Sequence, residues 1–99
     1  ALLSSLHPPE LSDEMVDLAT LYEYSIVKKI EKCESQADML HTSTSATLRH
    51  HAELQDKKAQ FFDTQKDLLV QAMIQKRLEP KQYKIEHFLE VEFYRSAAN

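Results

Sequence analysis

The stretch that decides the fold covers residues 15–40 and reads MVDLATLYEYSIVKKIEKCESQADML. From its fifth residue onward, apolar side chains recur in steps of three and four, at Ala19, Tyr22, Ile26, Ile30, Cys33, Ala37 and Leu40. This spacing is typical of a helix that packs lengthwise against another helix. Ser12 and Asp13 before it are suitable N-cap residues. The sequence therefore predicts a helix over residues 12–41.

Residues 41–47 read HTSTSAT and interrupt this pattern, because only one of the seven side chains is apolar. Serine and threonine hydroxyls compete with the backbone hydrogen bonds of a helix. A turn here predicts an all-α chain that forms an elongated antiparallel helical hairpin, or coiled coil, with a second helix over residues 46–78. The alternative is a single long helix that forms a dimeric coiled coil, because the apolar stripe resumes at Leu48.

Pro80 ends the second expected helix and suits the first position of another one, over residues 80–96. Apolar and polar residues alternate between Tyr83 and Tyr94, which is also typical of a strand. A strand needs a pairing partner, and this chain offers none. We therefore expect a short third helix, with a strand added to a partner's sheet edge as the alternative. The chain divides into a lead-in at residues 1–11 that contains Pro8-Pro9, a hairpin at 12–78, and a helix with its tail at 79–99.

The 99 residues include no glycine, where average usage of ~7% would supply about seven. Phosphate-binding loops, dinucleotide-binding turns and nucleophile elbows all require glycine. His50 and Glu53 have the i,i+3 spacing of a helical metal site, but no second unit of this kind accompanies them. Cys33 lies on the apolar stripe, which indicates a buried side chain. We therefore expect a protein that is not an enzyme, with no catalytic residue, cofactor or metal.

The charge and cysteine content indicate the class of partner and the compartment. The net charge is −4, and the cations alternate with acids, so a nucleic-acid partner is not expected. A single cysteine excludes an internal disulfide and favours the reducing cytoplasm. No apolar run approaches the ~18 residues of a membrane span.

Two sets of residues are candidates for helix contacts. The first is the expected hairpin seam, which consists of Tyr22, Ile26, Ile30, Leu40, Phe62 and Leu69. The second is an expected partner surface near the C-terminus, which consists of Phe88, Val91, Phe93 and Tyr94. Aromatic anchors surrounded by acids are typical of the centre of a protein interface with a charged rim.

These patterns predict a helical protein–protein interaction module, an assembly or adaptor subunit of an intracellular complex. Its expected partners are helices of other proteins or a second copy of the chain. The alternative is a peripheral membrane module of the helical-bundle kind in vesicle trafficking. Membrane contact is the less favoured function because it needs a basic face, and neighbouring acids dilute the available cations, Lys28, Lys29, Lys32, Arg49, Lys57 and Lys58.

Overall fold

The computed structural model describes residues 12–99, so the expected lead-in at residues 1–11 lies outside the described residues. Helices make up 86% of the described part, which contains no strand. The four helices are α1 (Asp13–His41), α2 (Ala46–Thr64), α3 (Lys66–Lys76) and α4 (Gln82–Ala98). The all-α prediction is confirmed, and the strand alternative for the C-terminal segment is wrong.

Serine hydroxyls cap the N-termini of the first two helices. The Ser12 hydroxyl accepts a hydrogen bond from the Met15 N–H at 3.3 Å and caps α1. The Ser45 hydroxyl accepts one from the Leu48 N–H at 3.4 Å and caps α2. Between them Thr42 has a φ of −83°, so the chain turns here without a left-handed residue. Because α1 ends at His41, the alternative of one continuous helix through this region is wrong.

The helix expected over residues 46–78 is divided in the structure. Gln65 separates α2 from α3 with φ −99° and ψ 9°, outside the regular helical values. The Thr64 hydroxyl just before it donates to the Gln60 carbonyl oxygen, and such back-bonding often bends helices. The next expected helix begins at Gln82 instead of residue 80, because Lys81 is extended after Pro80. It ends at Ala98, two residues later than expected.

The connection from α3 to α4 contains the one left-handed residue of the described part, Arg77, at φ 51° and ψ 46°. Its N–H bonds to the Ile74 carbonyl at 3.0 Å, and the Leu78 N–H bonds to the Met73 carbonyl at 3.1 Å. This pair of backbone hydrogen bonds ends many helices, and glycine usually occupies the left-handed position. Arginine there costs on the order of 1 kcal/mol.

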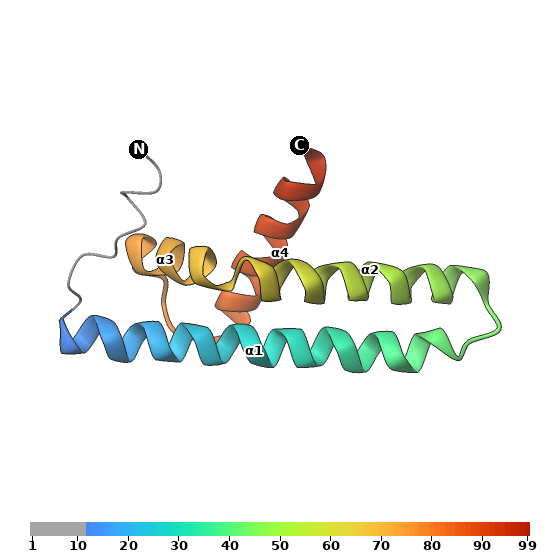
Figure 1. Cartoon of the computed structure of the whole chain (residues 1–99), viewed down its shortest axis with the longest axis horizontal. Helices are drawn as coiled ribbons and strands as arrows, with labels where there is room; N and C mark the ends of the chain where they lie inside the picture. Colours follow the sequence, from blue (N-terminus) through green and yellow to red (C-terminus); the bar gives the residue numbers. More distant parts are fainter. Residues whose placement is uncertain (1–11) are drawn as a thin grey trace.

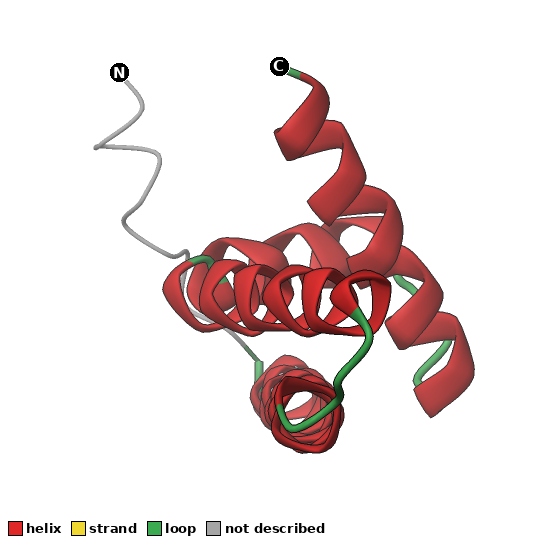
Figure 2. Ribbon diagram, turned by 90° about the vertical axis from the view of Figure 1, so that its right-hand side faces the viewer, coloured by secondary structure: helices red, strands yellow, loops and turns green. Residues whose placement is uncertain are grey.

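Helices α1 and α2 lie side by side and run in opposite directions (Figure 1). Helix α4 lies across one face of this pair, which we call the covered face; the other is the open face (Figure 2). No other described helix lies on the open face. The largest fully buried side chains are Tyr22, Ile26, Cys33, Phe62, Met73, Ile85 and Leu89. The molecule is long and thin, 51 × 28 × 16 Å, so much of the surface of each helix stays near solvent.

Candidate protein-docking surface

Buried ion pairs fix α4 on the covered face. Glu90 of α4 binds the ammonium groups of Lys29 at 2.8 Å and Lys58 at 2.9 Å, one from α1 and one from α2. Both lysines are buried, with exposures of 8% and 6%. Burial of Glu90 by itself would raise its pKa, but the hydrogen bonds and charges of the two lysines outweigh this and lower the pKa. One carboxylate therefore joins three helices.

A second polar contact lies one turn earlier on α4. Glu86 pairs with Lys32 of α1 at 3.0 Å, and the Gln82 amide donates to Glu86 at 3.0 Å and to the Ser25 carbonyl at 3.1 Å. The hydrogen bonds from Gln82 and Lys32 overcome the effect of burial and lower the pKa of Glu86. These contacts set the rotation of α4, because only one of its sides can present Gln82, Glu86 and Glu90 to α1.

The opposite side of α4 and the end of α3 form an apolar groove of about 590 Å³, which we call the α3–α4 groove. Its walls are Leu78, Tyr83, Phe88 and Val91, and its rim carries Lys76, Lys84 and His87. Tyr83 is 66% exposed and Val91 38% exposed. The Lys76 ammonium lies 5.3 Å from the centre of the Phe88 ring. Contiguous exposed apolar groups with a polar rim are characteristic of protein-docking sites.

The four residues of the expected partner surface do not share one exposed face. Phe88 and Phe93 are buried, and the Phe93 ring meets the Phe61 ring edge to face at 5.7 Å between centres. Val91 and Tyr94 are exposed. Sequence reasoning left Tyr83 out of that surface, although its spacing of eight residues from Val91 places both on one side of a helix.

The residues of the expected seam lie at different depths. Tyr22, Ile26 and Phe62 are fully buried and Leu69 nearly so, whereas Ile30 and Leu40 are half-buried.

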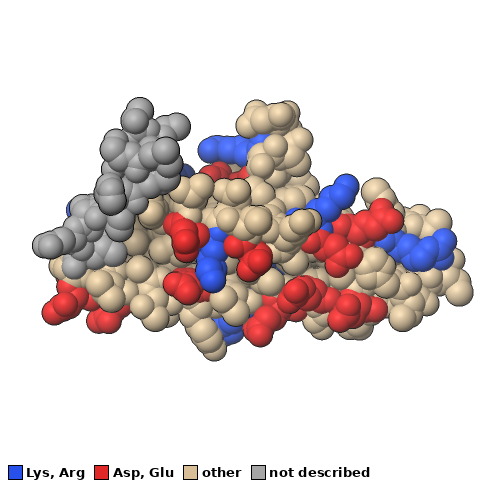
Figure 3. All heavy atoms as spheres, viewed as in Figure 1, with Lys and Arg blue, Asp and Glu red and all other residues tan. Residues whose placement is uncertain are grey.

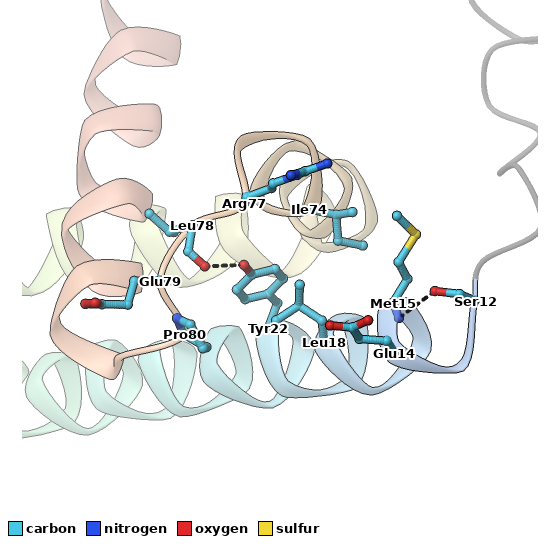
Figure 4. A pocket seen from close by; sticks show the side chains of 10 residues that line it. All are labelled: Ser12, Glu14, Met15, Leu18, Tyr22, Ile74, Arg77, Leu78, Glu79 and Pro80. Carbon is cyan, nitrogen blue, oxygen red and sulfur yellow. Dashed lines mark hydrogen bonds between the residues drawn. The ribbon is translucent and has the colours of Figure 1, made fainter.

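Tyr22 also connects α1 to the chain that follows α3, because its hydroxyl donates to the Leu78 carbonyl (Figure 4). Around it lies a groove of about 450 Å³ between the start of α1 and Arg77–Pro80. Burial raises the pKa of the Tyr22 hydroxyl, so it stays a neutral donor. Tyr22 thus holds the connection that leads to α4.

Cys33 and His41 are the reactive side chains whose surroundings bear on possible chemistry. Cys33 is fully buried, and burial raises the pKa of its thiol, which opposes formation of a reactive thiolate. His41 Nε2 lies 2.7 Å from the Asp56 carboxylate at the exposed end of the pair. Within residues 12–99, no three histidine, cysteine or acidic side chains are placed to hold a metal ion. In the same part of the chain, no helix has the length and apolar character needed to cross a bilayer.

Comparison of the chain with protein-family models, with curated proteins and with solved structures finds no match. The α3–α4 groove is more apolar than the groove around Tyr22. Its chemistry suits an apolar side chain from another protein better than a small polar substrate.

Proposed function

We propose that this chain is a non-enzymatic helical interaction module, an assembly or adaptor subunit of an intracellular complex. In this proposal α1 and α2 act as an antiparallel coiled-coil hairpin, and the α3–α4 groove receives a helix of a partner protein. The observation that carries it is the exposure of Tyr83 and Val91 above the buried Phe88. Aromatic side chains beside a closed apolar pocket are the usual anchors of protein interfaces. The single cysteine, buried on the apolar stripe, supports a reducing compartment such as the cytoplasm.

The ion pairs of α4 support a docking role. Two carboxylates, Glu86 and Glu90, fasten α4 to lysines of α1 and α2 on the side away from the groove. A partner then meets a surface whose backbone is already ordered, so association costs less conformational entropy.

The membrane alternative receives less support, because most lysines of the basic cluster have internal partners. Lys29 and Lys58 are buried against Glu90, and Lys32 pairs with Glu86. Among the described residues, Lys28, Arg49 and Lys57 of this group stay exposed without an ion pair, and Arg49 donates a hydrogen bond to the Ser43 carbonyl at 3.0 Å. We expect no co-sedimentation with vesicles of anionic lipid at physiological salt. Binding under these conditions would favour the membrane function.

A photo-crosslinking amino acid at position 83 tests the docking surface. We expect the photo-crosslinking amino acid in place of Tyr83 to form defined covalent adducts with a partner protein in cells. The matched control is the same replacement at Tyr24, which is 59% exposed on α1 outside the groove, and it should not give these adducts. Adding Val91→Asp should remove the adducts at position 83, because a charge in an apolar contact is costly. Identical adducts from both positions, or persistence with Val91→Asp, would contradict the proposal.

A further inference from the structure

The open face of the α1–α2 pair contains a third groove, of about 490 Å³, which we call the acidic groove. Its floor is apolar and consists of Val27, Ile30 and Ala59. Its rim carries carboxylates from both helices, Glu31, Glu34, Asp56 and Asp63. Figure 3 shows acidic side chains along this face, over both α1 and α2.

The acids follow the helices in rows. On α1 the row continues from Val27 through Glu31 and Glu34 to Asp38, in steps of four, three and four residues. On α2 Asp56 and Asp63 are seven residues apart, which is two helical turns. Because both rows follow the helix axes, the groove is a trough along the pair with carboxylates on both sides.

The charges of this groove have few internal partners. Among the described residues, Glu31, Glu34 and Asp63 have no cation within 4.0 Å, and Asp56 meets only His41. On the covered face the same two helices present Lys29 and Lys58 to a carboxylate of α4. The covered face therefore shows how this pair holds a helix: apolar contacts together with charges on α1 and α2 that meet an opposite charge on the bound helix. The open face also combines apolar side chains with charges from both helices, but these charges are exposed and negative.

We propose that the acidic groove binds an amphipathic helix rich in lysine and arginine from a partner protein. The apolar stripe of that helix lies against Val27, Ile30 and Ala59, and its cations meet the carboxylates of the two rows. Opposite charges speed the encounter and fix the register, and burial of the apolar stripe supplies affinity. The site lies on the face opposite α4, so it is distinct from the α3–α4 groove.

A second copy of the chain is a poorer occupant than a basic helix. The chain has 16 acidic residues against 12 lysines and arginines, so two copies repel each other. Lys81 and Lys84, at the start of α4, already pair with Glu79 of their own chain, so they are less available to the acids of a second copy.

The test uses the full chain and a synthetic helical peptide of about 18 residues, roughly five turns, followed by fluorescence anisotropy. The peptide has leucines at i, i+4, i+7 spacing with lysines on both flanks. A control peptide has glutamates in place of the lysines. We expect the lysine peptide to bind at least about tenfold more tightly than the glutamate peptide, because only the first complements the groove.

Variants of the chain separate docking in the groove from general attraction to an acidic protein. Glu34→Lys with Asp63→Lys should weaken binding by at least about tenfold. The matched control, Asp17→Lys with Asp67→Lys, makes the same change in net charge at exposed acids that do not line the groove. It should bind within about threefold of the wild type, since rim charges away from a contact act weakly. Val27→Ala, with no change in charge, should weaken binding by roughly threefold through lost apolar contact.

Equal losses in the two double variants, or no binding of the lysine peptide, would overturn the proposal. Light scattering could also overturn the proposal, if it shows that the free chain is a dimer and that the double variant Glu34→Lys with Asp63→Lys is a monomer. A second copy of the chain would then fill the groove. Circular dichroism of each variant checks that it folds. Val91→Asp, in the α3–α4 groove, should leave peptide binding unchanged, so this test is independent of the proposed function.

Discussion

The two faces of the α1–α2 pair use charge in opposite ways. On the covered face, Lys29 and Lys58 are buried, and Glu90 of α4 neutralises them at 2.8 and 2.9 Å. On the open face, acids such as Glu34 and Asp63 line the acidic groove and are exposed to water. A buried charge requires a partner because desolvation is expensive, whereas exposed like charges repel only weakly in water. The open face is thus stable without a cover and still complementary to one.

The largest expected effect comes from the apolar contact beneath α4. Leu89→Ala should lower the free energy of unfolding by about 3 kcal/mol, because the Leu89 side chain is fully buried and its loss leaves a cavity. On the open face, Val27→Ala should change it by less than about 1 kcal/mol, because Val27 is 36% exposed. Urea denaturation measures both. Equal losses would mean that α4 is not packed as described.

The next effect concerns the shared carboxylate. Glu90→Gln should lower the free energy of unfolding by about 2 kcal/mol, because two nearly buried ammonium groups lose their counter-charge. Glu34→Gln, the same change on the open face, should cost nothing. A loss in Glu34→Gln as large as that in Glu90→Gln would show that the two faces do not differ in the way described.

Acid should reveal the same difference between faces. The pKa values of Glu86 and Glu90 are lowered in the fold, chiefly by hydrogen bonds from Gln82, Lys32, Lys29 and Lys58 that overcome burial. A carboxylate with a lowered pKa stabilises the fold above its unfolded pKa of about 4.3, and this stabilisation disappears as the pH falls through the folded pKa. Stability should therefore decrease from pH 5 to pH 3. If stability decreases just as steeply in the double variant Glu86→Gln with Glu90→Gln, other acids cause the decrease.

Arg77 begins the connection that brings α4 to the covered face, and its left-handed backbone can be relaxed. Arg77→Gly should raise the free energy of unfolding by about 0.5–1 kcal/mol, because glycine adopts φ 51° without strain. Its matched control is Lys76→Gly, one residue earlier and helical, which should lower it by about 1 kcal/mol. Thermal denaturation compares the two. Destabilisation by both would show that the strain at Arg77 is negligible.

The periodicity of apolar residues predicted the features that depend on residues close together in the sequence. Steps of three and four residues identified α1, and Ser12 identified where it begins. The interruption at Gln65 was missed because Phe62 and Leu69 are seven residues apart, so the apolar stripe continues across it. The left-handed Arg77 was missed because glycine, the usual signal of such a residue, is absent.

The side of α4 that packs against α1 and α2 could not be predicted, because residues far away in the sequence determine it. Phe88 and Phe93 were expected on a partner surface, but both are buried: Phe93 packs on Phe61 of α2, and Phe88 lies at the end of α3, where the Lys76 ammonium is 5.3 Å from its ring centre. The two lysines that bind Glu90 are more than 30 residues from it along the chain, and no local pattern connects them.

The smallest expected effect is on the free energy of unfolding, and its sign depends on whether the lysine peptide is bound. Glu31→Gln with Glu34→Gln should raise the free energy of unfolding of the isolated chain by a few tenths of a kcal/mol, because two carboxylates on one side of α1 repel each other. High salt should abolish this gain by screening the repulsion. With the lysine peptide present, the wild type should become the more stable of the two, because only its carboxylates pair with the bound cations. A gain that persists with saturating peptide would mean that the acids of the open face have no part in binding.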